Sequence, residues 1–150
     1  MDTFSDFERD TSAGYLANHM ARVFALALDV ELHPLGLRLG AFPTLLLLWE
    51  GDGLTQRDLV QALDIEQPTM AATLTRMERD GLIQRSRDET DGRAQRIRLT
   101  ARGRALEAPA KAAAQRINAI ALRGFAEPER TAFLQAMRRV IANFEMASEK

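Results

Sequence analysis

Apolar and polar positions between residues 54 and 80 recur in a pattern that predicts two short helices joined by a tight turn. The first helix has an inner face with spacings of three and four, made of Leu59, Ala62 and Leu63. Thr55 is a suitable N-cap, and Asp58, three residues later, completes a capping-box pattern. We expect this helix to end near Asp64.

The second helix is predicted to begin at Pro68 and to end at Gly81. Proline suits the first helical position because its missing N–H would have no partner there, and glycine tolerates the positive φ common after a helix. The inner face of this helix consists of Met70, Leu74 and Met77. The opposite face carries short hydroxyl and methyl side chains followed by arginines: Thr69, Ala72, Thr73, Arg76 and Arg79.

A hairpin is predicted directly after the second helix. Asp91-Gly92 is a dipeptide typical of hairpin turns, and the run from Gln95 to Leu99 alternates polar and apolar side chains. Successive side chains of a strand point to opposite faces, so we expect Ile97 to face inward and Arg96 to face outward.

Two further segments with apolar helical stripes flank this central part of the chain. In the first, residues 11–33, the only formally charged residue before Leu28 is Arg22, and such a helix is not expected on the surface of a monomer. Residues 101–147 predict two further helices with apolar spacings of four and three, interrupted just before Pro109. These segments present more apolar surface than the central part can cover, which predicts a dimer interface.

The outward face of the second helix has the chemistry of a DNA-reading surface. Short side chains allow close approach to base edges, a methyl group can touch thymine, and arginine can bond guanine or phosphate. Two helices with such a face on the second form a helix-turn-helix, whose second helix enters the major groove. From this helix we expect DNA contacts by Gln67, Thr69, Ala72, Thr73 and Arg76. The alternative is an ordinary amphipathic helix with a solvated face, because the same geometry occurs in proteins that bind no DNA.

The basic hairpin favours the DNA-binding interpretation. A basic hairpin after such a helix is a wing, suited to following phosphates and reaching into a minor groove. Its expected DNA contacts are Arg85, Arg87, Arg93 and Arg96. The expected fold class is mainly α with a small β-hairpin wing (α+β). We expect one domain over residues 1–150, with a winged helix-turn-helix at 54–100 flanked by N- and C-terminal dimerisation helices at 11–33 and 101–147.

The order of motifs LTQRDL, IEQPTM, RMERDGLIQR, D-x-x-D-x-R and IRLTARG resembles the MarR (multiple antibiotic resistance regulator) family of bacterial transcription factors. The plan covers the whole chain, and the specific motifs lie between Leu54 and Gly103. The resemblance implies an obligate homodimer that binds a palindromic operator and is released by a small-molecule or redox input. One position departs: Gly92 stands where members often carry a basic residue, so the hairpin tip has one charge fewer.

The net charge of −1 does not by itself indicate a DNA-binding protein, but the distribution of charge does. Between residues 76 and 104 there are nine arginines and five acids, giving 9 − 5 = +4. The other residues hold 11 basic and 16 acidic groups, giving 11 − 16 = −5. The planar fork of arginine also suits phosphate and guanine better than the point charge of lysine.

Composition excludes several other classes of protein. The absence of cysteine excludes disulfides, thiolate metal sites and thiol redox sensing. His19 and His33 share no ligand spacing, and there is no nucleophile elbow, phosphate-binding glycine loop or paired-carboxylate arrangement, so we expect no enzyme, no metal and no cofactor. With no apolar run of membrane-spanning length and no signal-peptide pattern, a cytoplasmic location is the expectation.

The resemblance also implies a ligand crevice between the first helix, the short second helix and the base of the winged helix. The residues that this region offers are His19, Arg22, Phe42 and Trp49. An aromatic-lined site beside an arginine would suit a small aromatic carboxylate. The simpler interpretation is that the two aromatic residues are part of the core.

The sequence therefore predicts a sequence-specific DNA-binding transcriptional regulator. It is expected to act as a homodimer on double-stranded DNA, as a repressor released by a small ligand. Two alternatives remain: an architectural winged-helix protein that binds DNA without a ligand, and a winged helix that serves as a protein-interaction module.

Overall fold

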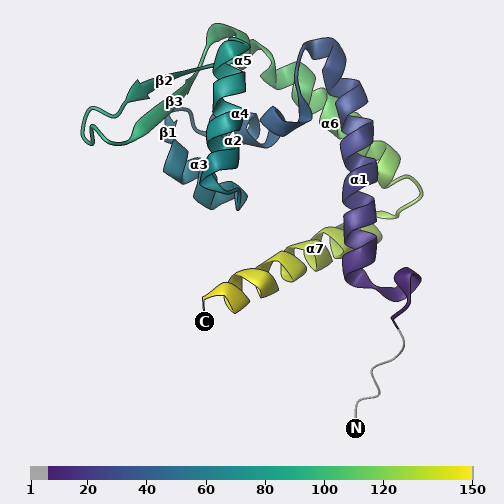
Figure 1. Cartoon of the computed structure of the whole chain (residues 1–150). Helices are drawn as coiled ribbons and strands as arrows, with labels where there is room; N and C mark the ends of the chain where they lie inside the picture. The colour runs from purple at the N-terminus through teal and green to yellow at the C-terminus, as the bar shows by residue number, and fades with distance from the viewer. Residues whose placement is uncertain (1–6, 150) are drawn as a thin grey trace. The chain divides into compact units, whose positions relative to one another are not determined.

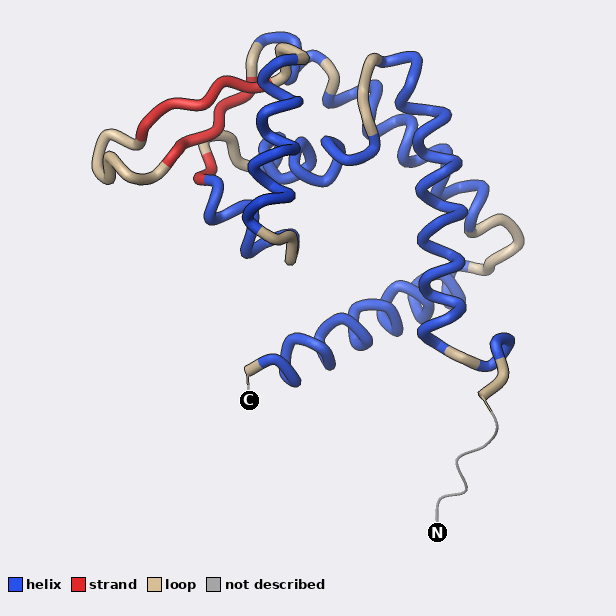
Figure 2. Tube along the Cα trace, in the orientation of Figure 1, coloured by secondary structure: helices blue, strands red, loops and turns tan. Residues whose placement is uncertain are grey.

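A computed structural model describes residues 7–149 and has seven α-helices and three short strands within that range (Figure 1, Figure 2). The elements in chain order are η1 Arg9–Thr11, α1 Ala13–Leu32, η2 His33–Leu35, η3 Leu39–Ala41, α2 Phe42–Glu50, β1 Leu54–Thr55, α3 Gln56–Leu63, α4 Gln67–Arg79, β2 Ile83–Arg87, β3 Gln95–Leu99, α5 Ala101–Ala105, α6 Glu107–Ala121 and α7 Glu127–Ser148. The predicted fold class is confirmed. By compactness the chain divides after Ile117, within α6, into two units, and each is described by itself.

The helix-turn-helix begins and ends where the sequence predicts. The Thr55 hydroxyl accepts the Asp58 N–H at 3.1 Å, and the Asp58 carboxylate accepts the Thr55 N–H at 2.9 Å, which completes the capping box. The helix ends as Asp64 adopts a left-handed conformation with φ 53°. The next helix, α4, begins one residue before Pro68 and is followed by Gly81, with φ 74°.

The sheet contains one more strand than the sequence predicts. Its order is β1-β3-β2, both pairings are antiparallel, and β1 pairs Leu54 with Ile97 and Thr55 with Arg96. The pattern of side chains does not predict β1, because a two-residue strand has no periodicity of its own.

The hairpin is confirmed, but the prediction that Asp91-Gly92 forms its turn is wrong in detail. The strands are joined by residues 88–94, and Gly92 does not have positive φ. The loop is closed instead by the Asp88 N–H, which donates to the Ala94 carbonyl at 2.9 Å, and the Ala94 N–H donates back to Asp91 at 3.0 Å. Asp91 therefore begins a turn at the far end of a longer loop.

The core of the first unit gathers under α4. The predicted inner face of this helix is buried, with Met70 and Leu74 at 0% and Met77 at 1% exposure. Around it pack buried residues of several other elements and connecting segments: Leu32, Leu37, Phe42, Leu45, Leu48, Leu59, Leu82, Ile83, Ile97, Leu99, Ala110 and Ala113. The core thus fixes which face of α4 is available to a partner.

A close contact joins α5 to the turn between α4 and β2. An ideal Cβ on Gly103 would lie 2.2 Å from the carbonyl oxygen of Leu82, so only glycine fits there. The Leu82 carbonyl also accepts the Thr100 N–H at 3.0 Å. On the other side, the Trp49 indole N–H donates to the Gly103 carbonyl at 2.9 Å. These contacts tie α2, α5 and the base of the hairpin together.

The break between α5 and α6 falls at Leu106, earlier than the interruption predicted just before Pro109. Pro109 is the third residue of α6. The first N–H groups of a helix have no partner within the helix, so a proline in the first turn costs no hydrogen bond and need not bend it.

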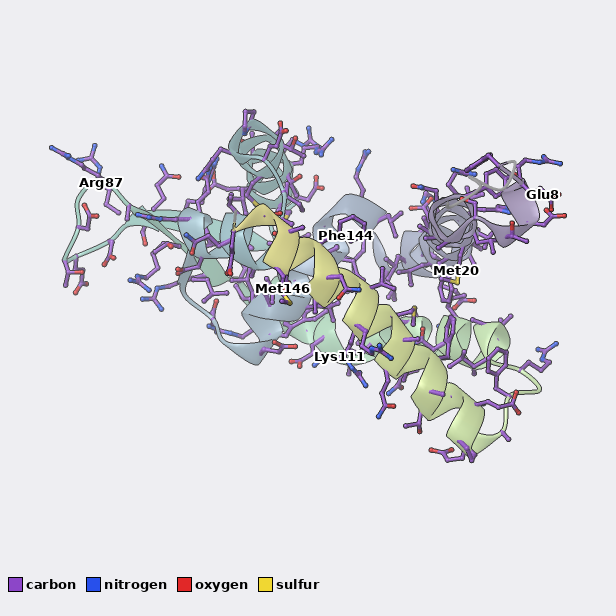
Figure 3. The ribbon with its side chains drawn as sticks, turned by 90° about the horizontal axis from the view of Figure 1, so that it is seen from below. Glu8, Met20, Arg87, Lys111, Phe144 and Met146 are labelled. Atoms are coloured by element: carbon purple, nitrogen blue, oxygen red, sulfur yellow. The ribbon has the colours of Figure 1, made fainter. Side chains whose placement is uncertain are left out.

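Two helices expose much of their apolar surface. In α1 only Leu32 is buried, and the exposed large residues are Leu16, Val23, Leu26 and Val30. In α7, which belongs to the second unit, no residue is buried, and the exposed set includes Leu134, Val140, Ile141, Phe144 and Met146. Figure 3 shows Phe144 and Met146 on α7. This agrees with the predicted surplus of apolar surface on the flanking helices.

Over residues 7–149 no single helix is long and apolar enough to cross a membrane. The segments Ala13–Leu35 and Leu39–Glu50 are long and apolar enough to span a membrane only when they are taken together. They are bent by 95° relative to each other. The four-leucine run of α2 includes Leu45 and Leu48, which are buried in the core at 0% and 1% exposure.

We predict that Gly103→Ala destabilises the protein by about 1–3 kcal/mol, because the new methyl group must displace the Leu82 backbone. Urea unfolding followed by circular dichroism measures this. Gly51→Ala is the matched control, because Gly51 has an extended φ of −160° and a Cβ added there would meet no atom within 4 Å. Equal stability of the two variants would contradict the close contact.

Candidate nucleic-acid interface

The outward face of α4 is largely as predicted. Its exposed residues are Gln67, Pro68, Thr69, Ala72, Thr75, Arg76, Glu78 and Arg79. The Gln56 side-chain amide donates to the Gln67 side-chain oxygen at 3.1 Å, which links the first residues of α3 and α4. This face therefore presents polar, methyl and guanidinium groups from one helix whose first turn is tied to its neighbour.

Thr73 is the exception, and its predicted outward orientation is wrong. It is only 9% exposed. Thr73 follows Met70 by three residues and precedes Met77 by four, so helical geometry places it on the buried stripe. Thr75 takes the exposed position, and its hydroxyl is engaged in a hydrogen bond to the Ala71 carbonyl at 2.9 Å.

The wing is attached to α4 through Arg85. The Glu78 carboxylate accepts the Arg85 backbone N–H at 3.0 Å and its guanidinium at 3.1 Å. These hydrogen bonds lower the pKa of Glu78 below its ordinary value. The Arg85 guanidinium is thus already paired with Glu78, and its side chain is only 22% exposed.

Arg96 is similarly engaged. One of its nitrogens donates to the Asp88 carboxylate at 2.9 Å, and the other donates to the Gly53 carbonyl. The hydrogen bond from Arg96 is the main cause that lowers the pKa of Asp88. Of the four wing arginines that the sequence offers as DNA contacts, Arg85 and Arg96 thus already have partners within the protein.

Arg87 and Arg93 are the two wing arginines that remain. Both are exposed, and neither forms an ion pair with any residue between 7 and 149. Figure 3 shows the side chain of Arg87 pointing away from the hairpin. These two guanidinium groups are available to an anionic partner.

A hollow of about 560 Å³ lies between the first turns of α3 and α4 and the wing. Its lining includes Gln56, Arg57, Gln67, Ala71, Arg85 and Arg93. Sequence reasoning missed Arg57. Its position could have indicated a role: Arg57 lies in the first turn of α3, where a positive charge is unfavourable for the helix dipole. An arginine at this position therefore does not stabilise the helix and is available for a partner.

A smaller hollow of about 230 Å³ lies on the other side of α4. Arg38 and Arg76 both line it, together with the inward-facing Thr73 and Met77. Arg38 was also missed, because it stands in a connecting segment that carries no motif. The exposed cations of α4 and the wing are thus extended on both sides by arginines distant in sequence.

The four residues predicted for a ligand crevice do not share one environment. Phe42 is 6% exposed and packs edge-to-face on Trp49, with ring centroids 6.3 Å apart. Trp49 donates its indole N–H to the Gly103 carbonyl. These contacts agree with the simpler interpretation of both as core residues. His19 and Arg22 lie on the exposed surface of α1.

Comparison with known proteins agrees with this geometry. The model of the MarR family matches residues 37–94, which include α2, the helix-turn-helix and most of the wing. An uncharacterized HTH-type transcriptional regulator of Bacillus subtilis (strain 168), YwoH, is 32% identical over 72 residues. This match covers 48% of the chain and 53% of YwoH, so the chain spans about half the length of this curated relative.

Solved structures match over nearly the whole chain. A MarR family transcriptional regulator from Listeria monocytogenes, complexed with a 26-mer DNA, is 26% identical with a TM-score of 0.80, covering 93% of this chain and 89% of that one. PcaV, a transcriptional regulator from Streptomyces coelicolor in complex with its natural ligand, is 25% identical with a TM-score of 0.79, covering 93% of this chain and 98% of that one.

Proposed function

We propose that this chain, which belongs to the MarR family, binds a palindromic DNA operator as a homodimer and represses transcription until a small molecule releases it. The observation that carries the proposal is the set of exposed arginines without ion-pair partners among residues 7–149, which lie on α4, on the wing and beside the hollows that flank α4. The relative from Listeria monocytogenes, which holds DNA, supports it.

In this proposal the exposed face of α4 lies in the major groove. Thr69 and Arg76 contact base edges, Gln67 reads adenine, and the methyl groups of Ala72 and Thr75 contact thymine. Thr73 is not part of the reading surface because it is buried.

The phosphate backbone is held by arginines on either side of α4. Arg57 and Arg93 line the larger hollow, and one DNA strand passes between them. Arg38 contacts a phosphate on the side of the smaller hollow, next to Arg76. Arg87 extends the contact along the wing toward the minor groove.

The homodimer is proposed to form through the apolar surfaces of α1 and α7. Leu26 and Val30 of α1 are 70% and 71% exposed, and Phe144 of α7 is 72% exposed. Residues of this size are rarely left exposed in contiguous patches unless another protein covers them. In a two-fold dimer each α4 helix would read one half-site of a palindromic operator, with the half-sites about one helical turn of DNA apart.

The ligand is proposed to be a small aromatic carboxylate bound near Arg22. PcaV is a relative with a natural ligand, which supports a small-molecule input here as well. Arg22 lies on the exposed surface of α1, and the only other charges of this helix are Asp29 and Glu31 near its end. The ligand would release DNA only if it binds one arrangement of the two winged helices more tightly than the other.

We predict that Arg76→Ala and Arg87→Ala weaken DNA binding in different ways. Arg76→Ala should cost about 1–3 kcal/mol on the cognate operator and little on random DNA, because it removes a base contact. Arg87→Ala should weaken binding to both and reduce the slope of log K against log salt by about 0.9, because it removes a phosphate contact. Fluorescence anisotropy over a salt series measures both effects. Equal losses on the two DNAs for both variants would contradict this assignment.

We predict that Val30→Glu converts the dimer to a monomer, because it places a charge within the apolar surface of α1. Sedimentation equilibrium measures the mass, and affinity for a palindromic operator should fall with it. The control is Ala21→Glu, nine residues away and therefore about half a turn round the helix at 3.6 residues per turn. A dimer that survives Val30→Glu would show that this surface does not form the interface.

We predict that Arg22→Ala weakens salicylate binding about tenfold or more, because a charge-assisted hydrogen bond to the carboxylate is lost. Isothermal titration calorimetry measures the affinity, and Arg79→Ala, which removes an exposed arginine of α4, serves as the control. Identical salicylate binding by wild type and Arg22→Ala would exclude Arg22 from the site.

A further inference from the structure

Arg96 lies on the central strand of the sheet, where its side chain can reach both neighbours. Its backbone pairs with Thr55 on β1 and with Ser86 on β2. Side chains two residues apart on a strand share a face, and diagonal neighbours across strands lie within reach of long side chains. Asp88, two residues after Ser86, is such a diagonal neighbour.

The guanidinium of Arg96 joins three segments of the chain. One nitrogen donates to Asp88 at 2.9 Å and another donates to the carbonyl of Gly53, in the turn before β1. The second carboxylate oxygen of Asp88 accepts both the backbone N–H and the hydroxyl of Thr90 at 3.3 Å. We call the set Gly53, Asp88 and Arg96 the Arg96 bridge.

The bridge holds the base of the loop that carries the free wing cations. Arg87 directly precedes Asp88, and Arg93 directly precedes Ala94, whose carbonyl accepts the Asp88 N–H at 2.9 Å. A loop of residues 88–94 without such contacts would lose conformational freedom on binding, and this loss would weaken the complex. Contacts that order the loop beforehand remove part of that cost.

We propose that Arg96 and Asp88 are positioning residues, which order the wing so that Arg87 and Arg93 meet the DNA backbone. This inference rests on the proposed DNA-binding function. The sequence alone predicts that Arg96 contacts the DNA directly. In this proposal Arg96 instead positions the arginines that make that contact.

The charges within the bridge favour positioning over direct contact. If Arg96 turned to a phosphate, the Gly53 carbonyl would lose its hydrogen bond from Arg96, and the Asp88 carboxylate would lose its counter-charge close to an anionic partner. The Asp88 side chain is only 13% exposed, so its negative charge would be left poorly hydrated.

The decisive experiment compares two neighbouring acids of the wing loop. Asp88→Ala and Glu89→Ala each remove one negative charge, but Glu89 is exposed and its side chain has no hydrogen-bond or ion-pair partner among residues 7–149. Electrostatics alone would make both variants bind DNA as well as wild type or better. The bridge predicts that Asp88→Ala binds about three- to tenfold more weakly, while Glu89→Ala does not.

Arg96→Ala completes the comparison. The bridge predicts a loss similar to that of Asp88→Ala, and a double variant no weaker than Arg96→Ala alone, because both changes break the same interaction. Anisotropy at fixed salt measures the affinities, and thermal unfolding confirms that each variant is folded. Tighter binding by Asp88→Ala, or additive losses in the double variant, would overturn the proposal.

A second readout needs no DNA. Amide hydrogen exchange of Thr90 and Ala94 in the free protein should become faster in Asp88→Ala and Arg96→Ala and stay unchanged in Glu89→Ala. Unchanged exchange in Arg96→Ala would overturn the bridge itself. Failure of the wild type to bind any DNA, with the exchange result as predicted, would instead reject the proposed function and leave the ordering of the loop established.

Discussion

The burial of one stripe of α4 determines how the rest of the first unit is used. Met70, Leu74 and Met77 are at most 1% exposed, and Thr73 lies on the same side at 9%. Since a helix can bury only one face against one core, the opposite face must point to solvent. Residues from α1, α2, α3, the hairpin and α6 contribute to that core, so they all serve to present the outer face of α4.

Ion pairs then decide which arginines are left for a partner. Of the nine arginines between residues 76 and 104, four pair with carboxylates: Arg79 with Asp80, Arg85 with Glu78, Arg96 with Asp88 and Arg104 with Asp52. The other five form no ion pair with residues 7–149. The local excess of positive charge therefore has two parts: four arginines that are paired with carboxylates, and five exposed arginines that are not. The unpaired arginines contribute most to the attraction of an anionic partner, because no neighbouring carboxylate offsets their charge.

Local signals in the sequence predict much of this fold, because they act over a few residues. The Thr55–Asp58 capping box, the buried stripe of α4 and the hairpin follow from spacing alone. Partners distant in sequence could not be predicted in the same way: the contact of Arg96 with Gly53 spans 43 residues, and that of Trp49 with Gly103 spans 54. Thr73 could have been placed correctly, since its spacing from Met70 and Met77 already put it on the buried face.

The most direct test of the central claim is the affinity of the wild-type protein for DNA from its own upstream region and for a scrambled fragment of equal length, measured by fluorescence anisotropy across a salt series. A sequence-reading regulator should bind the upstream DNA much more tightly than the scrambled one, with an affinity that falls steeply as salt rises. Equally tight binding to both fragments would contradict sequence reading and indicate an architectural DNA-binding protein.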